Sequence, residues 1–211
     1  MKRLAAPQPP PVRDVAGVVI AGGSSVRFGG EKAAAVLGDR PLLLWAIKRL
    51  QLSCGAVAVN ARPGGRAEAL ARSAGVPVLH DAPGDAAGPL AGVRAGLVWA
   101  LETGARALAV SPCDAPLLPD DLYMRLIAAA GAGAALAETA DGPQPLCSVW
   151  PVTALASVGE ALSEGAHPAL WKFLESLGAK RVPFEDSAAF ANINTREDLA
   201  SLADRRRSAR P

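Results

Sequence analysis

The sequence predicts a doubly wound α/β fold, in which a mainly parallel sheet carries helices on both faces. Short apolar runs alternate with segments of helical periodicity through about the first 130 residues. This alternation is typical of parallel strands joined by crossover helices. Half of the residues are hydrophobic, yet only 4% are aromatic. Such a composition allows a sizeable core and suits close packing of helices on a sheet.

The 211 residues are predicted to form one domain over 15–203, preceded by a disordered, proline-rich lead over 1–14 and followed by a solvated basic tail over 204–211. The net charge of +2 is too small to indicate a nucleic-acid partner. Three widely separated cysteines argue against a zinc site and fit a reducing compartment. Without a signal peptide or a transmembrane segment, we expect a cytoplasmic protein that does not enter a membrane.

The first strand is predicted over 15–21, where a continuous apolar run ends at glycine, as expected of a strand buried on both faces. Pro41 predicts a helix start, because proline fits the first turn, and residues 42–52 continue with helical periodicity. The next apolar run, over 56–60, is a second strand. The remaining elements of this half alternate between helix and strand, and they are a helix over 65–73, a strand over 76–79, a helix over 88–101, a strand over 105–111 and a helix over 119–130.

That last helix contains Asp120 and Asp121 in its predicted first turn, where acidic side chains stabilise the helix dipole. The second half is predicted to contain strands over 134–138, 145–150 and 180–183, and helices over 152–162 and 169–177. Thr195 is expected to open a final helix, because Asp198 follows three residues later in an arrangement like a capping box.

Ligands of such sheets bind beyond the carboxyl ends of the strands, where the predicted loops 21–32, 80–92 and 112–116 lie. The first loop reads AGGSSVRFGGEK, and its four glycines allow backbone amides to approach phosphates closely. Arg27 and Lys32 add positive charge. The loop matches neither the Walker A pattern nor G-x-G-x-x-G, and a plain surface turn is the simpler alternative.

The stretch SPCDAP directly follows a predicted buried strand. Pro112 and Pro116 stiffen this turn and hold Asp114 at the carboxyl edge of the sheet. A carboxylate in that place can hold Mg²⁺, which in turn bridges phosphates; alternatively it satisfies amides of the turn. Cys113 is expected to be a small buried residue rather than a nucleophile.

The stretch HDAPGDAAGPLAGVRAGL contains glycines at every fourth position, which are Gly88, Gly92 and Gly96. On a helix they form a smooth stripe against which a backbone or a flat ring can pack, although packing of the helix on the sheet explains the stripe equally well. Asp81 and Asp85 are candidates for reading a base edge or assisting a metal, and Asp85 is equally consistent with a turn.

Near the C-terminus, FANINT places Asn192 and Asn194 on either side of Ile193. In an extended chain the two amides would point to the same face, where they could grip a phosphate or the edge of a heterocycle. Loop and cap chemistry before the last helix is the alternative. His80 and His167 are the two histidines, and a structural role is expected for both.

Together these four stretches resemble one family, the molybdenum cofactor guanylyltransferases of the nucleotidyltransferase superfamily. The family's L-A-G-G…R-M-G-G…D-K loop corresponds to IAGGSSVRFGGEK, its G-P-L-A-G and P-C-D motifs are both present, and its F-x-N-x-N-T corresponds to FANINT. The four motifs occur in the family's order, and the resemblance runs from about residue 15 to residue 202.

The resemblance implies a Rossmann-like fold of the nucleotide-diphospho-sugar transferase type. It also implies Mg²⁺-dependent transfer of GMP from GTP to the terminal phosphate of molybdopterin, with release of pyrophosphate. Arg27, Lys32 and Asp114 would be catalytic, Asp114 would hold Mg²⁺, and Asn192 and Asn194 would lie on the acceptor side. The residues implied to contact the nucleotide are Ile20, Ala21, Gly22, Gly23, Lys32, Asn60, Asp81, Gly88, Pro89, Leu90 and Asp114. Molybdoenzymes or their chaperones are the implied protein partners.

The chain departs from the family's pattern mainly on the acceptor side. Glu31 stands where aspartate is common, and the loop is one residue shorter before Lys32. An arginine pair that relatives often carry is replaced here by Ala166, His167 and Pro168. A related transferase that uses CTP or another phosphate acceptor therefore stays open, although cytidylyltransferases usually read A-A-G in the first loop. A non-catalytic nucleotide-binding protein is the third alternative.

Overall fold

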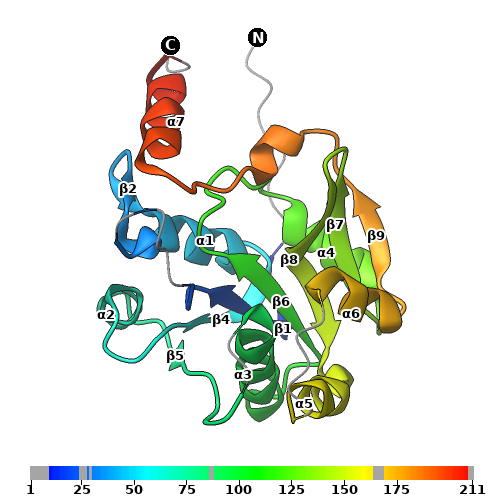
Figure 1. The fold of residues 1–211 in the computed structure, drawn as a ribbon. Coiled ribbons are helices and arrows are strands. Elements are labelled where there is room, and N and C mark those ends of the chain that lie inside the picture. Colours follow the sequence, from blue (N-terminus) through cyan, green and yellow to red (C-terminus); the bar gives the residue numbers. More distant parts are fainter. Residues whose placement is uncertain (1–9, 24–27, 29, 86–87, 164–168, 209–211) are drawn as a thin grey trace.

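The computed structural model describes residues 10–23, 28, 30–85, 88–163 and 169–208, with the backbone alone for 205–208. Seven strands form the main sheet in the order β5-β4-β1-β6-β8-β7-β9 (Figure 1). Their bounds are β1 (Val12–Ile20), β4 (Cys54–Asn60), β5 (Val78–Leu79), β6 (Ala107–Pro112), β7 (Ala135–Thr139), β8 (Gly142–Pro151) and β9 (Lys180–Pro183). A separate hairpin pairs β2 (Val36–Leu37) with β3 (Arg40–Pro41).

Most of the main sheet is parallel, as the sequence predicts. Strands β5, β4, β1 and β6 pair in parallel, and β9 pairs in parallel with β7. Strand β8 runs antiparallel to both of its neighbours, β6 and β7. The chain thus winds outward from β1 to β5, returns to β6, and continues to the opposite edge, which is the doubly wound arrangement.

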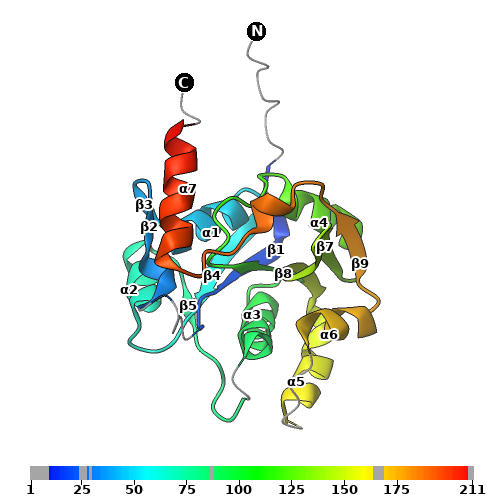
Figure 2. The ribbon, with the colours of Figure 1, turned by 45° about the horizontal axis from the view of Figure 1, so that its top comes forward.

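Helices cover both faces of this sheet (Figure 2). One hydrophobic cluster joins the sheet to α1, α2 and α4, and a second joins it to α3, α5 and α6. Alternate residues of β1 enter the two clusters, since Val19 packs in the first and Val18 in the second, as the period of two along a strand requires. The helices are α1 (Leu42–Gln51), α2 (Arg66–Ser73), α3 (Pro89–Glu102), α4 (Leu122–Ala130), α5 (Leu155–Ser163), α6 (Leu170–Ser176) and α7 (Arg196–Ser208), with short 3-10 turns η2 (Lys32–Ala34), η3 (Val152–Ala154) and η4 (Ser187–Phe190).

Several predicted boundaries were wrong, and three of the differences change how a segment is interpreted. Strand β1 begins at Val12, inside the predicted lead, because residues beyond the apolar run still pair with β4. Helix α4 begins at Leu122, whose N–H closes a turn to the Pro119 carbonyl. Asp120 and Asp121 therefore precede the helix instead of lying in its first turn. Helix α7 continues to Ser208, so the predicted tail begins as helix.

The predicted capping box at the start of α7 is confirmed. The Asp198 N–H donates to Thr195 Oγ1 at 3.1 Å, and the Asp198 carboxylate accepts from the N–H groups of Asn194 and Thr195 at 2.8 Å each. These backbone donors lower the pKa of Asp198, because they stabilise the charged carboxylate. Within the described part of the chain, every helix is too short or too polar to cross a membrane.

Candidate active site

Four parallel strands end in one row at the carboxyl edge of the sheet. Ile20 of β1 pairs with Asn60 of β4 on one side and with Pro112 of β6 on the other, and Asn60 pairs in turn with Leu79 of β5. The four segments that follow these strands must therefore start next to one another. This register brings together loops that are far apart in the sequence.

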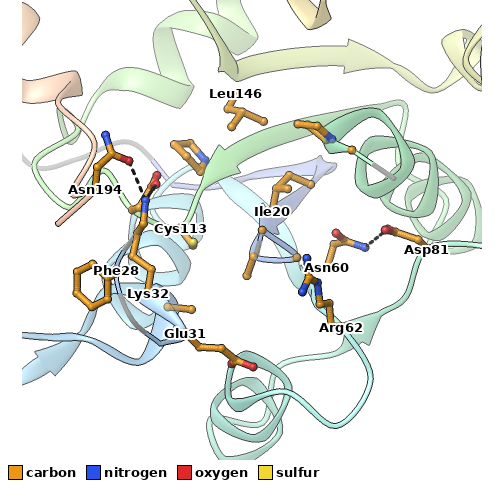
Figure 3. Close-up of a pocket in the computed structure, with 18 residues that line it drawn as sticks. Ile20, Phe28, Glu31, Lys32, Asn60, Arg62, Asp81, Cys113, Leu146 and Asn194 are labelled. Carbon is orange, nitrogen blue, oxygen red and sulfur yellow. Dashed lines mark hydrogen bonds and ion pairs between the residues drawn. The ribbon is translucent and has the colours of Figure 1, made fainter. Parts of the chain in front are cut away.

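A cavity of about 540 Å³ opens at this edge (Figure 3). It contains most of the side chains and glycines that the sequence motifs single out. The residues of the predicted site that line it are Ile20, Ala21, Gly22, Gly23, Lys32, Asn60, Asp81, Gly88, Pro89, Asp114 and Asn194. Sequence motifs that span 175 positions, from Ile20 to Asn194, thus meet in one place.

Lys32 connects the glycine-rich loop to the P-C-D motif, which contains Asp114, and to FANINT, which contains Asn194. Its Nζ lies 2.8 Å from Asp114 Oδ2 and 2.9 Å from Asn194 Oδ1 (Figure 3). The side chains of Lys32 and Asp114 are only 13% and 18% exposed, so the pair is largely shielded from water. A cation and a carboxylate are thus held together at the cavity wall, where each can bind a group of opposite charge.

Asn194 is brought to Lys32 by the backbone. The Ile193 N–H donates to the Asp114 carbonyl at 2.8 Å, and the Ile193 side chain is buried in a small cluster with Phe28. The capping box of α7 then holds the next residues. The C-terminal motif is therefore fastened directly to the loop that carries Asp114.

A second polar pair lies at the other end of the cavity. Asn60 is 3% exposed, and its Nδ2 donates to Asp81 Oδ1 at 2.8 Å (Figure 3). The carboxylate of Asp81 is thereby oriented by a buried amide that itself ends a sheet strand. The cavity has one end with a cation–carboxylate pair and another end with an amide–carboxylate pair.

Glu31 is a site residue that the sequence did not predict. Its Oε2 accepts from the Ala67 N–H at 2.9 Å, in the first turn of α2, where a carboxylate compensates the helix dipole. A Cβ at Gly65 would lie 2.8 Å from Glu31 Oε1, so glycine makes room for this contact. Glu31 thus fastens the end of the glycine-rich loop to α2, directly beside Lys32.

The cavity also contains residues whose roles were not predicted. Arg62 adds a cation just beyond β4, and a basic residue two positions after a buried strand was the available signal. Leu146 comes from β8, and no pattern in the sequence indicated it. Cys113 lines the wall as well, and burial raises the pKa of its thiol to about 12, which agrees with the predicted non-nucleophilic role.

Some predicted site residues do not meet in the cavity. Leu90, in the first turn of α3, is buried in a core cluster and does not line the cavity. Asn192 lies in a second cavity beside η4 and α7, so the two amides of FANINT do not share one face. Asp85 pairs with Arg94. The predicted catalytic Arg27 lies outside the described residues.

The histidines and the metal prediction can be compared with the structure only in part. His80 Nδ1 lies 2.8 Å from the Ala61 carbonyl, as expected of a structural histidine, and His167 is outside the described residues. Nowhere in the described part of the chain do three or more His, Cys, Asp or Glu side chains gather in a way that could hold a metal.

The comparison with protein families assigns the class first. The description "MobA-like NTP transferase domain" applies to residues 17–182, so the chain is a nucleotidyltransferase. The molybdenum cofactor guanylyltransferase of Cereibacter sphaeroides is 40% identical over 187 residues, which cover 87% of this chain and 93% of that protein. The one of Ralstonia nicotianae is 38% identical over 214 residues, covering 93% and 99%. The chain belongs to the molybdenum cofactor guanylyltransferase family.

A solved structure shows the same fold at lower sequence identity. Molybdopterin-guanine dinucleotide biosynthesis protein A from Archaeoglobus fulgidus superposes with a TM-score of 0.71 at 22% identity. The alignment covers 92% of this chain and 99% of that one. The doubly wound α/β prediction is confirmed.

Proposed function

We propose that this protein transfers GMP from GTP to the terminal phosphate of molybdopterin, with or without bound molybdenum, and releases pyrophosphate. The observation that carries this proposal is the contact of Lys32 with Asp114 in the cavity that also holds the Asn60–Asp81 pair. The Lys32–Asp114 pair at one end of the cavity would bind phosphates. The Asn60–Asp81 pair at the other end would bind the base. The family relationship supports GTP as the nucleotide.

The cavity can bind the nucleotide along its length. Gly22 and Gly23 line the cavity, and backbone without side chains lets phosphates approach the backbone N–H groups. Lys32 would neutralise phosphate charge as a compact cation. Asn60 and Asp81 would bind the guanine base, since together they supply hydrogen-bond donors and acceptors.

The transfer itself needs positioning and charge neutralisation more than acid–base catalysis. A terminal phosphate oxygen of the acceptor forms a new P–O bond to the α-phosphorus of GTP, while the bond between the α-phosphorus and the α,β-bridging oxygen breaks. The electron pair leaves with pyrophosphate, and the acceptor oxygen is already anionic near neutral pH. In-line placement of acceptor and leaving group is therefore the main requirement.

The residues present fit a Mg²⁺ ion bound together with the nucleotide. Mg²⁺ commonly takes one or two protein carboxylates, several waters and phosphate oxygens, without a closed protein cage. Asp114 supplies one carboxylate at the cavity wall, 18% exposed and beside the cation of Lys32. When bound there, Mg²⁺ would neutralise the charge that develops on the phosphates. We propose Asp114 as its protein ligand.

The acceptor would enter from the side of the C-terminal motif. Asn194 contacts Lys32 and lines the cavity, so it lies beside the proposed phosphate position. We propose Asn194 as an acceptor-side residue, and Arg27 as a further cation of the glycine-rich loop.

The test is direct synthesis of the product. Purified protein is incubated with Mg²⁺, molybdopterin and either GTP or CTP, and both pyrophosphate and the dinucleotide are quantified. The proposal predicts both products with GTP and at least about a hundredfold less with CTP. If product forms with CTP alone, the nucleotide donor is CTP and not GTP. If GTP binds but no product forms, molybdopterin is rejected as the acceptor.

A further inference from the structure

Strand β8 contains a bulge where it passes the cavity. Two consecutive residues of β7, Leu136 and Ala137, pair with Ser148 and Gln144 of β8. Residues 145–147 of β8 must therefore fit between two neighbouring pairs, so this segment bends out of the regular ladder. A bulge of this kind commonly redirects a side chain, and many bulges lie next to active sites.

The redirected side chain is Leu146, which lines the cavity (Figure 3). Because β8 runs antiparallel to β6 and pairs with it from Pro151 to Ser148, the first residues of β8 lie at the carboxyl edge of the sheet. Leu146 is partly buried and packs against the hydrophobic cluster of α3, α5 and α6. The next residue, Cys147, is buried in the cluster on the opposite face of the sheet.

Ser148 closes the bulge. Its Oγ donates to the Pro145 carbonyl at 2.7 Å and accepts from Trp150 Nε1 at 2.8 Å. Ser148 and Trp150 are both fully buried, so water does not compete for these hydrogen bonds. One hydroxyl thus ties the start of the bulge to the core, and Leu146 lies in the short segment that is held in this way.

The order of the strands indicates which ligand Leu146 meets. Along the edge of the sheet, the Asn60–Asp81 pair lies at β4 and β5, and the Lys32–Asp114 pair lies at the segments that follow β1 and β6. Strand β8 is the next strand in this row. Since the proposed function puts the base at the first pair and the phosphates at the second, the body of the acceptor extends toward β8 and Leu146.

We propose that Leu146 is a specificity-determining contact for the acceptor and that the bulge closed by Ser148 aims its side chain. This inference rests on the proposed function. The acceptor class is a phosphate monoester that carries a flat ring system, as molybdopterin does, because the apolar face of such a ring packs well on an aliphatic side chain. A sugar phosphate presents hydroxyl groups there instead. Ser148 touches no substrate and is a positioning residue.

The experiment compares Leu146→Ala with a matched control, Leu155→Ala. Leu155 of α5 is also partly buried and packs against the same cluster, but it does not line the cavity. Binding of molybdopterin is measured by fluorescence titration with Mg²⁺ and a GTP analogue whose α,β-bridge cannot be cleaved, and binding of GTP alone is measured calorimetrically. We expect the Kd for molybdopterin to rise at least about tenfold in Leu146→Ala, because an apolar contact is lost. It should stay within about twofold in Leu155→Ala, and the Kd for GTP should stay within about twofold in both.

Ser148→Ala tests whether the bulge aims Leu146. It is compared with Trp150→Phe, which also removes the bond between these two side chains but leaves the Ser148 hydroxyl to hold the Pro145 carbonyl. Both variants should melt at lower temperature. Only Ser148→Ala should weaken molybdopterin binding, by roughly fivefold for the loss of one hydrogen bond, with GTP binding unchanged. If Ser148→Ala does not fold, the result for Leu146→Ala decides the inference alone.

Equal molybdopterin binding by Leu146→Ala and Leu155→Ala would overturn the inference. Equal losses of molybdopterin and GTP binding in Leu146→Ala would also overturn it, because a general loosening of the fold affects both ligands. The proposed function is judged separately, on the unaltered protein. If that protein binds molybdopterin but forms no dinucleotide, the proposed transfer is refuted, and the comparison of Kd values still tests Leu146. Absence of molybdopterin binding by the unaltered protein would overturn both.

Discussion

The two halves of the sheet contribute very unequally to the cavity. In the half formed by β5, β4, β1 and β6, every strand ends in one row, and each following segment supplies at least one lining side chain. In the other half, Leu146 of β8 is the one strand residue among the described lining residues. Asn194 arrives separately, through a C-terminal segment fastened to the loop of Asp114.

The difference between the two halves shows where the position of a substrate site can be predicted from the order of strands along the sequence. Parallel strands in register place all their carboxyl ends together, so chemistry-bearing residues just after buried strands must converge. The antiparallel half follows no such rule. The proposed nucleotide side of the cavity is therefore well defined by the fold, and the proposed acceptor side depends on the one C-terminal segment that is fastened to the loop of Asp114.

The largest effect is expected from a substitution in the Lys32–Asp114 pair, at the carboxyl edge of the parallel half of the sheet. Asp114→Ala should lower kcat for pyrophosphate release on the order of 10²–10³-fold, because a charge-stabilising group is lost beside the reacting phosphates. Asp121→Ala is the control, since Asp121 is an exposed carboxylate in the same stretch that pairs with Arg125 outside the cavity. A loss below about threefold in Asp114→Ala would contradict the placement of the phosphates.

A smaller effect is expected at the contact between the glycine-rich loop and α2. Glu31→Ala should raise KM for GTP roughly fivefold, equivalent to the loss of about 1 kcal/mol for a helix-capping contact. Glu68→Ala is its control, because Glu68 accepts from the Gly64 N–H at the same helix end but lies outside the cavity lining.

Both glutamate variants should melt at lower temperature than the unaltered protein. Glu31→Gln should recover most of the KM, because its amide oxygen can still accept from the Ala67 N–H. An equal rise of KM in both alanine variants would indicate a general loosening of α2 instead of a defect in the loop.

The smallest expected effect is on the stability of the C-terminal segment around Asp198, and this effect should depend on pH. Because backbone donors lower the pKa of Asp198 in the folded state, its contribution to stability is present above the unfolded pKa of about 3.9 and is lost as the pH falls through the folded value. Urea unfolding should show the unaltered protein as more stable than Asp198→Ala at pH 6. The difference should shrink below about pH 4, and a difference independent of pH would refute this role of the carboxylate.

The structure brings predicted site residues together where they directly follow buried strands. Lys32 and Asp114 were predicted as partners of one site, because each is a charged residue in a stiff or glycine-rich loop after an apolar run. Their direct contact at 2.8 Å then follows from the pairing of β1 with β6.

The positions of other cavity residues could not be predicted, because they depend on the rotation of a helix or on a backbone group far away in the sequence. Gly88 and Pro89 line the cavity, but the next residue, Leu90, turns into the core. Likewise, Glu31 finds its partner at Ala67, 36 positions away, and nothing local indicates that contact. Asn192 and Asn194 diverge for a similar reason, because their orientation is set by the burial of Ile193 and by the cap of α7.

The most direct test of the account is a crystal structure of the protein with GTP and Mg²⁺. We predict the phosphates between the Gly22–Gly23 backbone and Lys32, the metal on Asp114, and the guanine edge on Asp81 and Asn60. A nucleotide bound in the reverse direction, or in the cavity beside Asn192, would contradict the assignment of the two ends of the site.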